Sequence, residues 1–159
     1  AVDLGMRFPW PWLEDYGPLS YVCCQLSFGN PSGYDYLALA TWLMQAGADP
    51  NVVDETWTVP LHHAARLGRL DLARMLVRAG ARLDWQDVAG VSALILAAAG
   101  NHFPVAEYLI RAGADPMVED VKGRRALDYA LNRGKNDALA RMLRRAEVNR
   151  PTKKSKTGT

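Results

Sequence analysis

Cysteine is nearly absent from this chain, with only Cys23 and Cys24 among 159 residues. Adjacent cysteines can close a disulfide only through a strained ring, so a framework of stabilising bridges is excluded and a reducing compartment, the cytoplasm, is favoured. Long apolar runs are also missing. One uncharged run, residues 91–100, falls well short of the roughly 18 residues that a membrane helix needs. No membrane-spanning segment is therefore expected.

Charge of one sign is not in large excess either, because the formal net charge is +2. Residues 141–159 carry seven Arg or Lys against one Glu, which leaves the rest of the chain mildly acidic. Nucleic-acid binding normally requires a basic patch on the folded surface, so no nucleic-acid partner is expected. The end of the chain has no apolar residue after Asn149. We therefore expect residues 147–159 to form a disordered basic tail.

The chain does contain an internal repeat of 33 residues, within a globular composition of 49% hydrophobic and 23% charged residues. Gly47, Gly80 and Gly113 are spaced at this interval. Three further sets share it: Asp54, Asp87 and Asp120; Leu61, Leu94 and Leu127; Ala64, Ala97 and Ala130. A constant interval predicts stacked copies of one unit, since a short unit cannot bury its own apolar face.

The apolar residues of each unit indicate two antiparallel helices. In the third unit, residues 94–99 are a short apolar run, and Val105 and Leu109 follow at helical spacing. In the first unit the second helix is expected at about residues 36–46. A glycine then stops each second helix in a left-handed cap. The predicted fold class is all-α.

The motifs in these units resemble those of the ankyrin repeat family. Residues 59–65, Val-Pro-Leu-His-His-Ala-Ala, are similar to its Thr-Pro-Leu-His-x-Ala pattern, with Val in place of Thr. Residues 47–51 and 113–116 resemble its Gly-Ala-Asp-x-Asn loop. The resemblance covers residues 17–146 and implies an ankyrin-type α-solenoid of stacked helix-turn-helix units with short hairpin-like loops.

The repeat domain, residues 17–146, is predicted to hold about four repeats, at about 17–53, 54–86, 87–119 and 120–146. The first repeat is degenerate, because Pro18 and Pro60 are 42 residues apart and nine of these are extra. Two glycines and a proline mark residues 27–35 as the insertion. Residues 1–16 are expected to be an N-terminal cap, or the remnant of a preceding segment of a longer array.

No motif makes a positive case for an enzyme, a metal site or a cofactor. His62 and His63 are adjacent, and neighbouring side chains on a helix point about 100° apart, so they do not readily chelate one ion. The resemblance makes His62 the structural histidine that joins the loop to the helix, and His63 is expected to be exposed. The recurring aspartates are expected to cap backbone N–H groups in tight turns: Asp54, Asp87 and Asp120.

The resemblance also implies a non-enzymatic protein-interaction module that binds a folded partner through its hairpin tips and the concave face of its first helices. By position, the predicted tip residues are Glu55, Thr56, Trp57, Thr58, Val88, Ala89, Val91, Val121, Lys122 and Arg124. The predicted helix residues are Arg66, Leu67, Ala99, Asn132 and Arg133. The apolar centre and cationic rim of this strip suit a protein with an acidic border.

Two aromatic features leave alternatives open. Trp57 stands where the family has a tip glycine, often with a positive φ, so either the turn differs or Trp57 is displayed as an anchor. Packing of Trp57 against Trp85 is the alternative to display. The insertion carries Phe28 and Tyr34, with Tyr36 nearby, and is a second candidate surface. Its alternative is an aromatic lid packed on the first repeat.

Three roles follow. The first is an interaction module that acts as an inhibitor or immunity-type protein for a bacterial toxin, or as an effector. The second is a regulatory or structural segment of a larger protein that packs on its own parent. The third, an enzyme, would need a deep pocket with a strongly shifted titratable group. We predict the first, as a monomer without a cofactor.

Overall fold

The computed structural model describes residues 19, 22–23, 36–54, 56–132 and 137–149. The elements assigned within these ranges are helices alone, which confirms the all-α prediction: α2 (Tyr36–Gln45), α3 (Pro60–Arg66), α4 (Leu70–Arg78), α5 (Ala93–Ala99), α6 (Phe103–Ala112), α7 (Ala126–Asn132) and α8 (Asp137–Val148). Among these helices, none has the length and apolar character to span a bilayer.

Several predictions lie outside the described residues. They concern the N-terminal segment 1–16, the insertion 27–35 with Phe28 and Tyr34, the tip residue Glu55, the helix residue Arg133, the side chain of Tyr36, and the tail beyond Asn149. The boundaries proposed for the four repeats also stay predictions, although each of the last three contains one first helix and one second helix.

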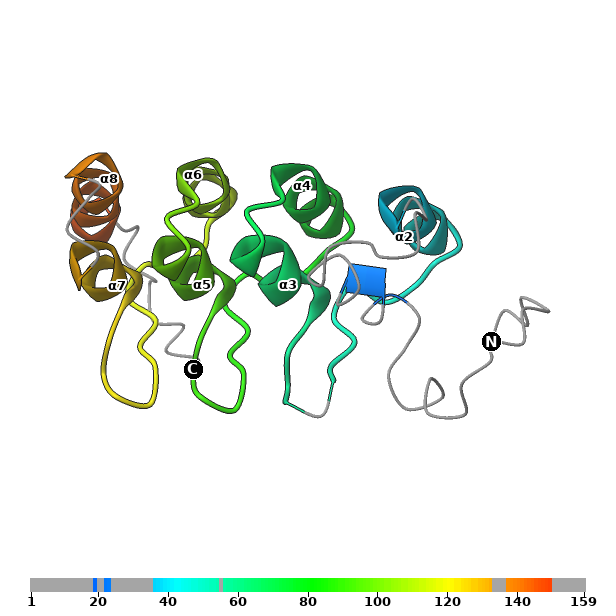
Figure 1. Cartoon of the computed structure of the whole chain (residues 1–159), viewed down its shortest axis with the longest axis horizontal. Coiled ribbons are helices and arrows are strands. Elements are labelled where there is room, and N and C mark those ends of the chain that lie inside the picture. Colours follow the sequence, from blue (N-terminus) through cyan, green and yellow to red (C-terminus); the bar gives the residue numbers. More distant parts are fainter. Residues whose placement is uncertain (1–18, 20–21, 24–35, 55, 133–136, 150–159) are drawn as a thin grey trace, which may run out of the picture.

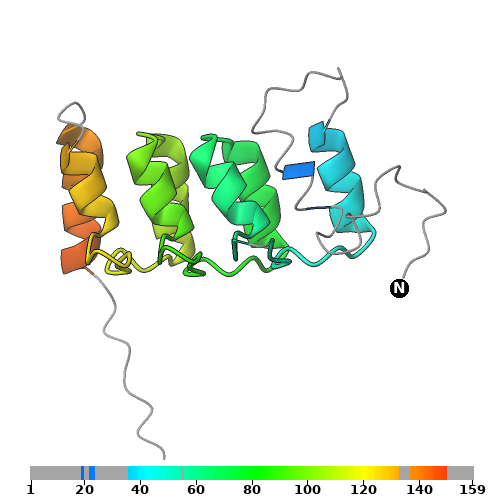
Figure 2. The same cartoon turned by 60° about the horizontal axis from the view of Figure 1, so that its bottom comes forward.

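The helices form two rows, as Figure 1 shows. The first helices α3, α5 and α7 lie side by side in one row, and the second helices α2, α4, α6 and α8 form the other. The connections between successive helix pairs project beyond the first-helix row as hairpin-like loops. In the turned view of Figure 2, these loops follow one another along one side of the array.

Alanine lies where neighbouring first helices meet. Ala64, Ala97 and Ala130 are all buried, and a methyl side chain lets adjacent helices approach closely. Leucines complete the core between the rows: Leu61, Leu72, Leu76, Leu94 and Leu109. The 33-residue ladders of the sequence are therefore the residues that one repeat buries against the next.

The second helices end as predicted, except the last. Gly47, Gly80 and Gly113 follow α2, α4 and α6 with φ values of 87°, 92° and 103°, which only glycine adopts at little cost. The fourth repeat is shifted, since the buried residues Leu72, Val105 and Leu139 are 33 and then 34 residues apart. This shift places Glu147 at the glycine position. Helix α8 accordingly has 12 residues, against 9 in α4 and 10 in α6. It includes residues 147 and 148, so the tail does not begin at residue 147 as expected.

The recurring aspartates build the hairpins. In each of the last three repeats, aspartate Oδ1 accepts two backbone N–H groups at 2.9 Å: Asp54 from Thr56 and Thr58, Asp87 from Ala89 and Val91, and Asp120 from Lys122 and Arg124. The capping prediction is confirmed. Backbone hydrogen bonds then join successive tips, from Val88 N to Thr56 O at 3.2 Å and from Val121 N to Ala89 O at 3.0 Å.

A matched pair of glycine variants tests whether this stacking of tips stabilises the fold. Gly90 and Gly123 have φ values of 73° and 71°, so alanine at either position costs about 1–2 kcal/mol of backbone strain. At Gly90 the new Cβ would also lie 2.9 Å from Val121 N, whereas at Gly123 it meets nothing within 4 Å. We expect Gly90→Ala to lower the free energy of unfolding by about 1 kcal/mol more than Gly123→Ala, measured by urea denaturation. Equal losses would show that contact between tips contributes little.

Candidate interaction surface

Three of the large apolar side chains that are exposed in the described part of the chain lie at the hairpin tips. Trp57, Val88 and Val121 are 57%, 66% and 72% exposed. They belong to three successive tips, which the two backbone hydrogen bonds hold in a row. The tips therefore form one continuous surface across three repeats.

Trp57 adopts the backbone conformation of the glycines that it replaces. Its φ is 59°, close to the values at Gly90 and Gly123. Its N–H donates to Asp54 O at 3.0 Å, as that of Gly90 donates to Asp87 O at 2.9 Å. The turn thus keeps its shape, and a bulky residue is held in the left-handed region, which is strained for any residue with a Cβ.

Trp57 is also both packed and displayed, so the two alternatives are not exclusive. Its ring stacks on Trp85 with the centroids 6.1 Å apart and the planes at 18°. Trp85 Nε1 donates to Trp57 O at 2.8 Å, and the Arg82 guanidinium lies 5.3 Å from the centre of the Trp85 ring. More than half of Trp57 nevertheless stays exposed. Stacking therefore fixes the orientation of an accessible tryptophan.

The other predicted surface residues divide into three groups by exposure. The exposed ones are Thr56, Arg66, Ala89, Lys122 and Asn132, and the half-buried ones are Leu67, Val91, Ala99 and Arg124. Thr58 is 9% exposed, so the expectation that its side chain is displayed was wrong. Its hydroxyl lies 2.9 Å from that of Thr56, and its backbone N–H is bound by Asp54, so the hairpin itself covers it.

His62 has the structural role predicted for it. Its Nδ1 accepts from Val59 N at 3.3 Å, and its Nε2 lies 3.0 Å from Val91 O of the next repeat. Burial lowers the pKa of His62, which favours the neutral ring with the proton on Nε2 donated to Val91 O. In the fourth repeat Asp128 takes the position of His62. Its Oδ2 accepts from Arg125 N at 2.8 Å, as His62 Nδ1 accepts from Val59 N.

His63 is 4% exposed, so the expectation that it is exposed was wrong. Arg66 Nη2 lies 2.7 Å from His63 Nδ1, and Asp54 Oδ2 lies 3.9 Å from His63 Nε2. The equivalent residue of the fourth repeat, Tyr129, donates its hydroxyl to Asp120 Oδ2 at 2.8 Å. A side chain at this position lies between the first helix and the hairpin aspartate, which is why it is buried.

Arg124 also contacts the hairpin aspartate of its own repeat, Asp120. Its Nε donates to Asp120 Oδ2 at 2.9 Å, and its guanidinium lies 4.6 Å from the centre of the Tyr129 ring. Burial opposes ionisation of Asp120, but the donors from Arg124, Tyr129 and Lys122 outweigh it and hold its pKa far below the usual range. Arg124 therefore stabilises its own hairpin, and Lys122 is the freely exposed cation at that tip.

The surface offers exposed apolar and cationic side chains that suit binding. Within the described ranges no group of three or more His, Cys, Asp or Glu side chains is arranged to hold a metal ion. Stacked helix pairs with a projecting row of loops define a helical repeat protein that presents a broad surface.

Sequence comparison gives the family of this repeat protein. The family model for ankyrin repeats (3 copies) matches residues 31–120 and 61–152, so the chain belongs to the ankyrin repeat family. No curated protein matches the chain. Ankyrin repeats indicate a protein–protein interaction module, so this is the class of function that the family gives the chain. Members of the family typically have no enzymatic activity.

The burial of His63 predicts a pH-dependent stability. Burial and the neighbouring Arg66 lower its pKa from 6.5 to about 4. Between these values the unfolded chain binds a proton that the folded chain does not, so this stability is present above pH 6.5 and is lost as the pH falls towards 4. We expect urea unfolding to show a loss of about 2 kcal/mol between pH 7 and pH 5.

The variant His63→Gln serves as the control, because it removes this titration. Burial lowers the pKa of His62 as well, so some dependence in the same direction should remain. The same loss of stability in the variant and in the unaltered protein would show that His63 is not the group responsible.

Proposed function

We propose that the chain binds a folded protein partner through the strip formed by its hairpin tips and the adjacent exposed face of its first helices. The central residues of the strip are Thr56, Trp57, Val88, Ala89, Val121 and Lys122, with Arg66 and Asn132 on the helices. The observation that carries the proposal is Trp57, a strained tryptophan that is displayed where the other tips have glycine.

Strain supports a binding role because it is unnecessary for the fold. Glycine forms the same turn at the two following tips, so a tryptophan costs stability that the hairpin itself does not require. A large aromatic ring that is already oriented loses little conformational freedom on binding, which makes it an effective anchor. Val88 and Val121 extend the apolar surface beside it. Lys122 and Arg66 add positive charge, which suits a partner with acidic groups around its apolar contact.

The setting proposed for this activity is a reducing compartment, on the cysteine content alone. A partner bound across three tips would have part of its surface blocked from other molecules. An inhibitory role, such as that of an immunity-type protein, is one use of such a contact and can be tested once the partner is identified.

Capture of the partner from a lysate of the source cells tests the surface. Trp57→Gly is the informative variant, because it removes the ring and leaves a residue that suits the positive φ. We expect it to reduce the captured partner at least about tenfold, the effect of losing one interface hot spot. Arg78→Ala, on the exposed outer side of α4, is the matched control and should bind as the unaltered protein does.

Thermal unfolding of each variant shows that the fold is intact before binding is compared. If Trp57→Gly retains the partner in full while Arg78→Ala loses it, the partner uses the outer helices and the proposed strip is the wrong surface.

A further inference from the structure

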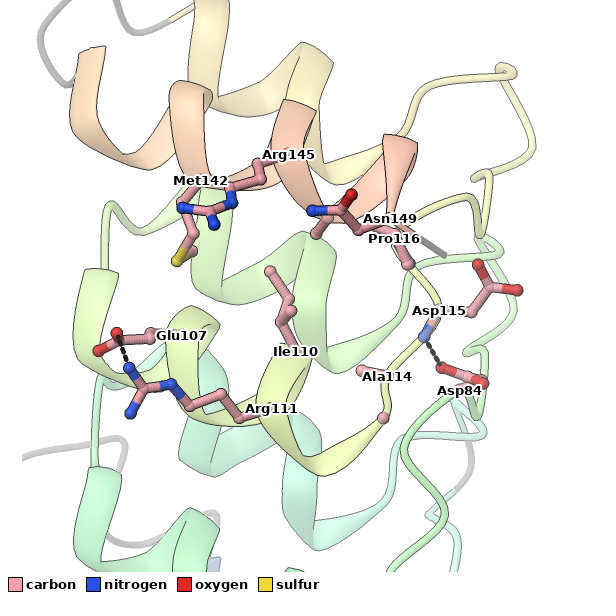
Figure 3. Close-up of a pocket in the computed structure, with 12 residues that line it drawn as sticks. Asp84, Glu107, Ile110, Arg111, Ala114, Asp115, Pro116, Met142, Arg145 and Asn149 are labelled. Carbon is pink, nitrogen blue, oxygen red and sulfur yellow. Dashed lines mark hydrogen bonds and ion pairs between the residues drawn. The ribbon is translucent and has the colours of Figure 1, made fainter. Parts of the chain in front are cut away.

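A hollow lies on the side of the array opposite the hairpin tips, between the second helices α6 and α8. Its volume is about 440 Å³, within the range of roughly 300–1,000 Å³ that ligand pockets have. Its apolar lining comes from α6, α8 and the loop after α6: Ile110, Ala114, Pro116, Met142 and Ala146. Figure 3 shows Ile110 projecting into the space that these elements surround.

The irregular fourth repeat shapes one end of the hollow. Helix α8 has Glu147 where a glycine would stop it, and it continues to Val148. Asn149, at the end of this longer helix, lines the hollow together with Pro116. Glu147 turns away to an ion pair, with its Oε1 3.3 Å from Arg125 Nη1. The extended end of α8 therefore forms a wall that the regular repeats do not have.

Charges are separated along the hollow. Figure 3 shows Asp84 and Asp115 on one side of Ile110, and Arg145 with the Glu107–Arg111 ion pair on the other. In the described ranges Asp84 forms no ion pair. The helices α6 and α8 both end near this acidic side, since Ala114 and Asn149 line the hollow, and helix C-termini add partial negative charge. That side favours a cation.

The negative charge of Asp84 exceeds what the fold requires. Asp84 Oδ1 accepts from Asp115 N at 2.7 Å and so joins consecutive repeats. Asn51 makes the equivalent bond one repeat earlier, where its Oδ1 accepts from Arg82 N at 2.7 Å. A neutral amide is therefore sufficient for this contact. Compared with that amide, the carboxylate of Asp84 lacks the Nδ2 donor that reaches Gly80 O at 3.2 Å from Asn51, and it adds a negative charge at the edge of an apolar hollow.

We infer that the hollow between α6 and α8 is a second docking site, which takes a peptide segment of a partner protein with an apolar side chain next to a lysine or arginine. The apolar side chain lies on Ile110 and Met142, and the cation lies beside Asp84. This site is separate from the hairpin tips, so one chain can hold two protein segments on opposite faces.

Isoleucine methyl NMR tests this directly, because the chain has only two isoleucines, Ile95 and Ile110. Ile95 is buried in the core and serves as the internal reference. The probe is the blocked peptide acetyl-Gly-Lys-Leu-Gly-Gly-amide, added to the full-length protein. We expect a saturable shift of the Ile110 methyl signal with no shift of Ile95. A control peptide with glutamate in place of lysine should bind at least about fivefold more weakly.

Two matched variants separate the charge from the shape of the site. Asp84→Asn keeps the hydrogen bond to Asp115, on the precedent of Asn51, and should weaken the lysine peptide about fivefold at low salt and little at high salt. Arg145→Gln removes a charge from the other end and should not weaken it. Trp57→Gly should leave this titration unchanged. Binding at the hollow can therefore be tested independently of the binding proposed for the hairpin tips.

Four results of these titrations would overturn the inference. They are the absence of a saturable Ile110 shift at millimolar peptide, equal affinity for the two peptides, an undiminished affinity in Asp84→Asn, and a shift of Ile110 with protein concentration alone. The last would assign the hollow to a second copy of the chain. Binding that appears only after residues 150–159 are removed would assign it to the chain's own basic end, and would equally exclude a partner segment as its natural occupant.

Discussion

The close contact between neighbouring first helices is the constraint on which the rest of the structure depends. A pair of short helices has too little interior to bury its own apolar residues. Ala64, Ala97 and Ala130 let α3, α5 and α7 approach closely enough for the leucines of the second helices to fill the remaining space. Because the first helices pack closely, the hairpin-like loops that connect successive helix pairs also lie next to one another. The row of hairpins is therefore a consequence of helix packing.

The hairpins can hold a strained backbone because three kinds of contact restrain them. The aspartate carboxylate accepts two backbone N–H groups, and each tip is joined to the next by one backbone hydrogen bond, which the later tip donates. A first-helix side chain, His63 or Tyr129, also contacts the aspartate. A turn fixed in this way keeps its shape even with tryptophan at a glycine position. The regular parts of the fold thus support the one irregular residue that gives the surface its own character.

Departures from the repeat pattern coincide with the features that distinguish this chain from a uniform array. Trp57 replaces a tip glycine, Asp84 replaces the asparagine of the preceding repeat, and Glu147 replaces a helix-stopping glycine. The first alters the hairpin surface, and the other two shape and charge the hollow between α6 and α8. A repeat scaffold tolerates these changes because each unit contacts only its neighbours, so a local irregularity does not propagate.

The amino-acid sequence alone determined the period, the helix pairs, the glycine stops, the aspartate caps and the role of His62. Each of these is a local requirement, or one repeated at a fixed interval, so a pattern along the chain records it. The sequence did not reveal that Thr58 and His63 are buried, that Trp57 is both stacked and exposed, or that a hollow lies beside α8. These features depend on contacts between residues of neighbouring elements, such as Trp57 with Trp85 or Ile110 with Met142. Only the packed structure sets the distances between such side chains, because burial and exposure are properties of the assembled surface and not of the segment.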